Sequence, residues 1–345
     1  MIRARSPYII SINEASQVST KIELFISFGA LGGSPTLSYT LSKAIPASNA
    51  PTTYYDIAPY IREYFDHTAY SNVTTSLTAA VSYTCIDKLN VRVKRYKTVG
   101  VTETLVDTTD YIATDGYSEF ADSVNYNGGN YLLDQKTYYY HNGSNAGFIM
   151  LYAASNDKIR WTNVTDGIVY LSVSLSLGFY YVPRCYNSEF TKEYTVELLN
   201  SSNVMQATWT FKPVEECLYT PVKVDFINRH GAFQREFFFK ASNDNIEVTN
   251  KDYNLMQPYD YSLTGGQRTT YNQNGKQSIK VNSGWVEEDF KDNLKQLMLS
   301  EKVLVDEKPA ILKTKSIELN KSLNTKQINY SLEFEFAYDL INSIV

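Results

Sequence analysis

Residues 328–336 of this 345-residue chain read Ile-Asn-Tyr-Ser-Leu-Glu-Phe-Glu-Phe, the clearest amphipathic strand in the sequence. Successive side chains of a β-strand point to opposite faces of the sheet, so every second residue shares a face. The apolar face would carry Ile328, Tyr330, Leu332, Phe334 and Phe336, and the polar face Asn329, Ser331, Glu333 and Glu335. The pattern predicts a strand with one buried face in a protein rich in β-sheet.

The residues on the N-terminal side of this strand supply candidate partners for its apolar face. Residues 221–240 are typical of two strands, and the turn between them, residues 228–231, reads Asn-Arg-His-Gly. Further along, a stripe of apolar residues recurs at helical spacing after an acidic first turn. The stripe consists of Val286, Phe290, Leu294, Leu297 and Met298. We predict one amphipathic helix over 285–302, and we expect the mostly polar residues 243–276 to form a loop.

The N-terminal part of the chain also favours strands. Residues 22–28 alternate between apolar and mixed positions, as in a half-buried strand. Residues 54–65 (YYDIAPYIREYF) are typical of a strand end that enters a short helix. The middle of the chain is rich in Tyr, Asn and Gly, with many short strand-like stretches between turn sequences, as in sandwiches and barrels.

The fold class that follows is mainly β, with two or three β-sandwich-like modules and one amphipathic helix in the C-terminal module. We expect an N-terminal β-sandwich-like module over 1–115 and a Tyr/Asn-rich β module over 116–215. A C-terminal β module over 216–345 would contain the helix at 285–302. The first boundary is placed in a loop predicted at 107–117.

The composition argues against several classes of function. The formal net charge is −5, and the densest basic run, at 92–97, is interleaved with apolar residues, so we expect no nucleic-acid binding. No apolar run approaches the roughly eighteen residues of a membrane-spanning helix, so we expect no membrane partner. The N-terminus lacks the apolar segment of a signal peptide. The 29 Tyr residues suit half-buried strands and protein interfaces, where the ring packs and the hydroxyl reaches a polar partner.

The chain offers few groups for catalysis. Its three His and three Cys residues have no partners at a diagnostic spacing, and no hydrolase, zinc-protease, phosphate-loop or dinucleotide motif is present. Glycoside hydrolysis needs two carboxylates across a cleft. The candidate groups are Glu333 with Glu335 on one strand face and the acidic cluster at 287–289, which are better explained as solvated and helix-start charges. We therefore predict no enzymatic activity, no cofactor and no metal.

One group of aromatic residues could form a contact surface. Tyr138, Tyr139, Tyr140 and Trp161 lie near Asn/Gly turns, and exposed aromatic rings can stack on sugars. The same side chains could instead pack between sheets, which is a common role of aromatics in sandwich cores. We favour packing, and binding to a glycan array would separate the two alternatives.

Both ends of the chain resemble a known family. The N-terminal part of the resemblance comprises residues 6–10 (SPYII), 38–43 (SYTLSK) and 54–65. The C-terminal part comprises residues 221–240 (PVKVDFINRHGAFQREFFFK), Trp285, 294–301 (LKQLMLSE) and 323–342 (LNTKQINYSLEFEFAYDLIN). These stretches are similar to a family of uncharacterised structural virion proteins (tail, baseplate or neck) of tailed bacteriophages, including marine and Bacteroidota-infecting types. The Tyr/Asn-rich middle is not covered by the resemblance.

The resemblance implies a non-catalytic structural subunit of a tailed-phage virion, in the tail, the baseplate or the head–tail neck. Such a subunit contacts other virion proteins and forms a homo-oligomer in a ring or another symmetric complex. We expect it in the virion, after synthesis in the host cytoplasm without a signal peptide. The alternative is a receptor- or carbohydrate-binding β-sandwich protein of the phage tail.

Overall fold

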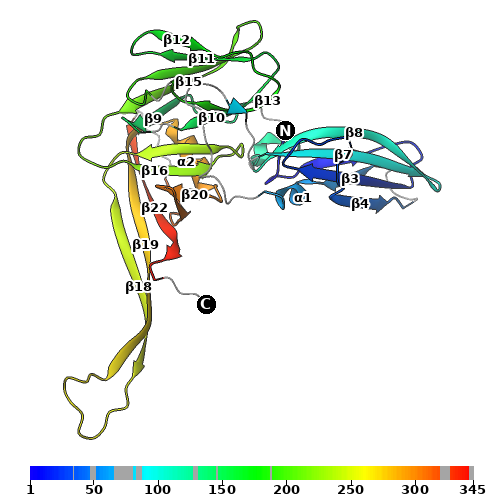
Figure 1. Ribbon diagram of the computed structural model, residues 1–345. Helices are drawn as coiled ribbons and strands as arrows, with labels where there is room; N and C mark the ends of the chain where they lie inside the picture. The colour runs from blue at the N-terminus through cyan, green and yellow to red at the C-terminus, as the bar shows by residue number, and fades with distance from the viewer. Residues whose placement is uncertain are drawn as a thin grey trace. The chain divides into compact units, whose positions relative to one another are not determined.

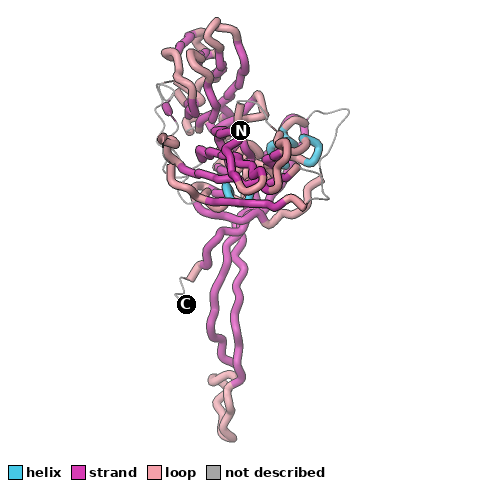
Figure 2. Tube along the Cα trace, turned by 90° about the vertical axis from the view of Figure 1, so that its right-hand side faces the viewer, coloured by secondary structure: helices cyan, strands magenta, loops and turns pink. Residues whose placement is uncertain are grey.

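A computed structural model describes residues 1–33, 35–46, 52–65, 81–82, 88–126, 131–144, 147–186, 189–318 and 327–341 (Figure 1). Strands make up most of the regular structure, as Figure 2 shows, which confirms the predicted mainly β fold. In this described part of the chain, no helix is both long enough and apolar enough to span a membrane.

The chain divides into two compact units. One consists of Met1–Val214 and Phe226–Arg235, and the other of Glu215–Asp225 and Glu236–Val345. The three modules that we placed with boundaries at 115 and 215 stay a prediction.

The first unit begins with a five-stranded sheet in the order β1-β8-β7-β3-β4. Its strands are β1 (Ile2–Arg3), β8 (Thr102–Thr114), β7 (Lys88–Val99), β3 (Ser19–Ser27) and β4 (Tyr39–Ala44). β1 runs parallel to β8, and the other neighbours are antiparallel.

The loop predicted at 107–117 is wrong, because β8 continues to Thr114. Its polar residues resemble a turn in sequence, but they pair with β7 along the strand. Arg92 Nε lies 2.6 Å from Asp110 Oδ1, and Arg95 Nε donates to Asp107 Oδ1 at 2.7 Å. Both carboxylates therefore lie on a sheet surface, opposite arginines of the neighbouring strand.

A second layer covers one face of this sheet. It consists of β2 (Ile9–Ile12), β5 (Thr53–Asp56) and α1 (Ala58–Arg62), and β2 pairs with β5. Leu24 and Val91 of the sheet share one core with Ile57 and Ile61 of this layer. The strand-to-helix segment predicted over 54–65 is confirmed.

Two further sheets complete the first unit. The three-stranded sheet has the order β10-β13-β6, with bounds Phe148–Ala153, Gly178–Pro183 and Val81–Ser82. The five-stranded sheet has the order β12-β11-β14-β15-β9, with bounds Ile168–Leu171, Lys158–Asn163, Tyr194–Leu199, Met205–Val214 and Thr137–His141. A short 3-10 turn, η2, spans Phe120–Asp122. The many short strands predicted for the middle of the chain are thus confirmed.

The hairpin predicted around residues 228–231 is formed by β16 (Val222–Ile227) and β17 (Phe233–Phe238). Gly231 in its turn has φ +77°, and a Cβ atom there would lie 2.7 Å from the backbone nitrogens of Asp115 and Gly116. Glycine suits this position because it tolerates both the positive φ and the close backbone approach.

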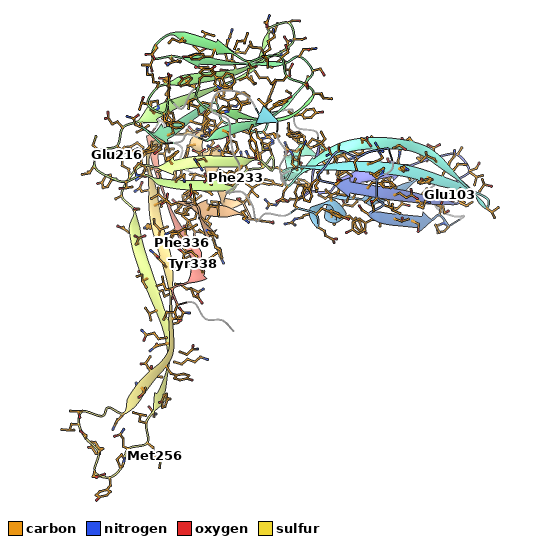
Figure 3. The ribbon with its side chains drawn as sticks, in the orientation of Figure 1. Glu103, Glu216, Phe233, Met256, Phe336 and Tyr338 are labelled. Atoms are coloured by element: carbon orange, nitrogen blue, oxygen red, sulfur yellow. The ribbon has the colours of Figure 1, made fainter. Side chains whose placement is uncertain are left out.

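The second unit contains most of a seven-stranded sheet in the order β17-β16-β20-β21-β22-β19-β18. The remaining strands are β20 (Val303–Val305), β21 (Lys308–Leu312), β22 (Gln327–Asp339), β19 (Arg268–Glu287) and β18 (Asn243–Asn254). All five apolar side chains of residues 328–336 are buried, so the predicted face of β22 is confirmed. Beyond this stretch, the ring of Tyr338 stacks on Phe336 with centroids 5.6 Å apart (Figure 3).

The amphipathic helix is shorter than predicted. α2 spans Phe290–Met298 rather than 285–302, and Trp285 and Val286 belong to β19, where they pair with β22. Val286 shares the helical spacing of the stripe, but the β-ladder extends past it and fixes an extended backbone. The apolar residues that α2 buries are Phe290, Leu294 and Leu297.

Candidate functional site

The four aromatic residues considered as a contact surface lie in one sheet of the first unit. Tyr138, Tyr139 and Tyr140 belong to β9, and Trp161 belongs to β11. Tyr138, Tyr140 and Trp161 are at most 1% exposed, whereas Tyr139 is half-buried. Three of the four rings therefore fill the core, as the packing alternative expects, and only Tyr139 keeps part of its surface accessible.

The polar atoms of two of these aromatics are satisfied inside the unit. Trp161 donates from Nε1 to the carbonyl oxygen of Pro183 at 2.8 Å, and the Tyr140 hydroxyl donates to the carbonyl oxygen of Lys192 at 2.6 Å. Burial raises the pKa of Tyr140, so its hydroxyl stays protonated as a donor. These groups are arranged to hold the sheet together.

A pocket of about 490 Å³ opens beside the turn of the β16–β17 hairpin, within the first unit. Tyr131 and Trp209 form part of its wall, and Asp134, Arg229 and His230 contribute polar groups. A concave site with a histidine and a carboxylate is a candidate for proton-transfer catalysis.

Both ring nitrogens of His230 are engaged in hydrogen bonds within the first unit. Arg3 Nη2 lies 3.0 Å from Nδ1, and Nε2 lies 2.8 Å from Asp134 Oδ1. A guanidinium can only donate, so Nδ1 accepts and Nε2 carries the proton that it donates to Asp134. Burial lowers the pKa of His230, which keeps the ring neutral at neutral pH. With both nitrogens engaged, His230 is placed to lock the turn rather than to transfer protons.

Backbone contacts of the same turn support this assignment. The Tyr117 amide donates to the carbonyl oxygen of Arg229 at 2.8 Å, and Thr114 Oγ1 donates to that of His230 at 2.7 Å. Asn228 and His230 are at most 5% exposed. The turn is therefore anchored against the end of β8, beside the pocket.

One pair of the carboxylates considered for glycoside hydrolysis, Glu333 and Glu335, lies on the polar face of β22. In the acidic cluster at 287–289, Glu287 ends β19 and Asp289 is the N-cap residue of α2. Glu333 is 3.1 Å from Lys313 Nζ, and Glu335 is 3.0 Å from Lys276 Nζ. They share one strand face instead of facing each other across a cleft, and each has a lysine partner. Within the described ranges, no group of three or more His, Cys, Asp or Glu is arranged to hold a metal ion.

The feature that sequence reasoning missed is a long hairpin made by β18 and the outer half of β19. The loop predicted at 243–276 is wrong, because Asn243 pairs with Lys280 and the ladder continues as far as Asn254 with Arg268. β22 accompanies β19 only inward from Lys276. Beyond that point the ladder has two strands, and we call residues 249–273 the arm.

The base of the arm is braced by the last described residues. Leu340 donates its amide to the carbonyl oxygen of Gly275 at 2.8 Å, and the Ile341 amide donates to Asn274 Oδ1 at 3.0 Å. In contrast, every residue of β18 is exposed, on both faces of the strand. The arm therefore leaves the sheet as a two-stranded ribbon (Figures 1 and 2).

The tip of the arm, residues 255–267, presents apolar side chains to solvent. Met256, which Figure 3 labels at the end of the arm, is 100% exposed. Tyr259 is 98% exposed and Leu263 93%. The tip is closed by its own hydrogen bonds, since Leu255 donates to the carbonyl oxygen of Gln267 at 2.9 Å. The arm thus has a defined end that carries large apolar groups without any covering surface within the described part of this chain.

A signal for the arm is present in the sequence but is easily overlooked. Ile246 and Val248 alternate with polar residues in β18 just before the arm, and the returning strand contains Thr-Thr-Tyr at 269–271, which are residues that favour strands. Because both faces are exposed, the stretch lacks the apolar face by which we identified the other strands.

Comparison of the chain with known protein families, with curated proteins and with solved structures found no significant match.

Proposed function

We propose that this chain is a non-catalytic structural subunit of a tailed-phage virion, in the tail, baseplate or neck, and that it docks on a neighbouring subunit through the arm. The observation that carries the proposal is the arm itself: a regular hairpin beyond the core of its unit, with Met256, Tyr259 and Leu263 exposed at its tip.

The physical argument concerns what stabilises such an element. A two-stranded hairpin alone is marginally stable in water, because it has no face buried against a second layer. Each large apolar side chain that becomes buried on a partner contributes about 1.5–3 kcal/mol. The tip therefore gains most of its stabilisation on a surface supplied by another molecule, which is how an assembly subunit uses an arm.

One edge of β18, which pairs with no other strand in the described part of the chain, adds a second means of attachment. β18 is the last strand of its sheet, and a long edge strand offers a row of backbone donors and acceptors to another chain. An extended partner segment can pair along such an edge while apolar side chains set the register. The resemblance of both chain ends to structural virion proteins supports the same function.

The test removes the arm and leaves its base. Thr249 and Asn274 are opposite each other, so residues 250–273 can be replaced by Asn-Gly, which favours a two-residue hairpin turn. We expect this variant to fold with an unchanged melting temperature and to be absent from purified virions of the phage that encodes it, whereas the wild-type chain is present and its arm contacts a neighbour in a cryo-EM map.

The matched control changes an exposed apolar residue at another hairpin tip. Val101, between β7 and β8, is 100% exposed, and Val101→Ser should leave incorporation intact. Normal incorporation of the truncated chain, or absence of the wild-type chain from the particles, would contradict the proposal.

A further inference from the structure

A second candidate contact lies in the first unit, on strand β12. β12 is the last strand of the order β12-β11-β14-β15-β9, so one of its edges has no neighbour among the strands that the structure describes. Residues 167–178 read Gly-Ile-Val-Tyr-Leu-Ser-Val-Ser-Leu-Ser-Leu-Gly and contain no charge and no proline. Edge strands usually carry charged residues or proline, because these residues prevent pairing with another chain.

The register of β12 fixes which backbone groups face the open edge. Leu171 is opposite Arg160 of β11, and the Ser172 amide donates to the carbonyl oxygen of Ile159 at 2.8 Å. In an antiparallel ladder, inward-bonded and outward-pointing residues alternate. The backbone groups of Val169 and Leu171 therefore point away from β11.

The side chains of the same residues lie on the outer face of the sheet. Tyr170 is opposite the buried Trp161, so its neighbours along the strand point to the other side. Val169 is 57% exposed, Leu171 55% and Val173 83%. An apolar stripe and a set of outward backbone groups thus coincide along this short segment.

Electrostatics favours a second copy of the chain as the occupant. Two uncharged strands can lie side by side without opposing like charges. On the outer face, Arg160 and Glu197 are paired with each other across β11 and β14, and Lys158 of β11 donates to Asn203 Oδ1 at 3.0 Å. The stripe is also self-complementary, because valine flanks Leu171 at two residues on either side.

We propose that a second copy of this chain adds antiparallel to β12 about a two-fold axis at Leu171. Leu171 of one copy lies opposite Leu171 of the other, and Val169 lies opposite Val173. The central pair exchanges two backbone hydrogen bonds, and the two stripes form one apolar strip across a continuous sheet. The contact is isologous, as two-fold symmetry requires.

This inference deepens the proposed function, since it names a second copy as one neighbour, and it rests on that function only for the expectation of a homo-oligomer. The residues of β12 are separate from the arm, so an experiment can contradict dimerisation through β12 without contradicting docking through the arm, and the reverse. The truncated chain without residues 250–273 should still dimerise through β12.

The experiment is sedimentation velocity of the full chain over a range of concentrations. We expect a dimer whose dissociation constant rises at least about tenfold in Leu171→Lys, because the two-fold axis places the two lysines opposite each other. Leu171→Thr, which keeps a strand-forming residue without charge, should weaken the dimer less. Val101→Lys, with the same charge change at an exposed turn, should leave the dimer unchanged.

A cross-linking variant keeps the proposal testable if Leu171→Lys does not fold. In a background with Cys85→Ser and Cys217→Ser, Leu171→Cys should form a disulfide-linked dimer on mild oxidation, because Cα atoms of such a pair lie about 5.5 Å apart. Val101→Cys in that background is the control. A wild-type chain that stays monomeric at tens of micromolar, a dimer unaffected by Leu171→Lys, or loss of the dimer only on arm truncation would overturn the proposal.

Discussion

The two consecutive hairpins of the chain differ in where their turns lie. The β16–β17 turn is buried, with His230 5% exposed and Gly231 packed against backbone, whereas the tip of the β18–β19 hairpin exposes Met256 completely. The first turn is held by contacts within its own unit. The second is held by its ladder alone, so its apolar groups are available to a partner. Changes in the first should reduce stability, and changes in the second should reduce association.

The largest effect on stability is expected in the sheet from which the arm extends. Phe334 of β22 is fully buried and lies opposite Ile279 of β19. Phe334→Asp removes a large apolar side chain and buries a charge, so we expect a loss of at least about 5 kcal/mol and unfolding of the second unit. Thermal melting of the full chain followed by circular dichroism would show it. Glu333→Ala, on the opposite face, removes an ion pair with Lys313 and a long hydrogen bond from Ser278, and it should cost less than about 1 kcal/mol. Equal losses would mean that the faces are assigned wrongly.

The next largest effect on stability is expected from replacing glycine in the anchored turn, compared with replacing glycine in the arm tip. A methyl group added at Gly231 (φ +77°) would lie 2.7 Å from backbone atoms, whereas one added at Gly266 (φ +65°) in the arm tip would have its nearest neighbour at 3.9 Å. Gly231→Ala combines positive φ with a clash and should cost about 2–4 kcal/mol, while Gly266→Ala carries only the local strain of about 1 kcal/mol. Chemical denaturation of both variants measures the difference. Similar losses would remove the distinction between an anchored and a free turn.

A smaller effect concerns pH and the anchored turn. Burial lowers the pKa of His230 below its ordinary 6.5, against the opposing pull of Asp134 and with help from Arg3 and Arg229. The unfolded chain therefore takes up this proton first, so stability falls as pH drops below about 6.5, by at most about 1.4 kcal/mol per pH unit. Melting temperatures between pH 5 and pH 8 should show a slope that His230→Gln reduces. An unchanged slope in the variant would exclude His230 as its source.

The smallest effect on stability is expected at the arm tip. Replacing Met256, Tyr259 and Leu263 together by Ser removes no contact with the core, so the melting temperature should stay within the error of the wild-type value. The same triple variant should lose incorporation into particles. A clear drop in melting temperature would show that the tip packs on its own chain.

The contrast between the hairpins also explains what the sequence could and could not predict. β22 and the β16–β17 hairpin were predictable because burial of one face imposes alternation, and because Asn and Gly mark the turn. The arm was missed because exposure on both faces removes that alternation. Trp285 and Val286 were assigned to the helix since their spacing fits a helix, but pairing with β22, a contact distant in sequence, decides their conformation. For Tyr138 and Trp161 the sequence favoured packing between sheets over an exposed contact surface, and both side chains are buried in the structure.

Hydrogen exchange, measured on the isolated chain and on the assembled particle, tests the central claim most directly. In the isolated chain, the amides of residues 228–232 should exchange slowly and those of 249–254 and 268–273 rapidly, because a two-stranded ribbon without a buried face opens easily. On assembly, the arm amides should become protected while those of residues 228–232 change little. Arm amides that are already protected in the isolated chain, or that exchange equally fast in the particle, would contradict the account.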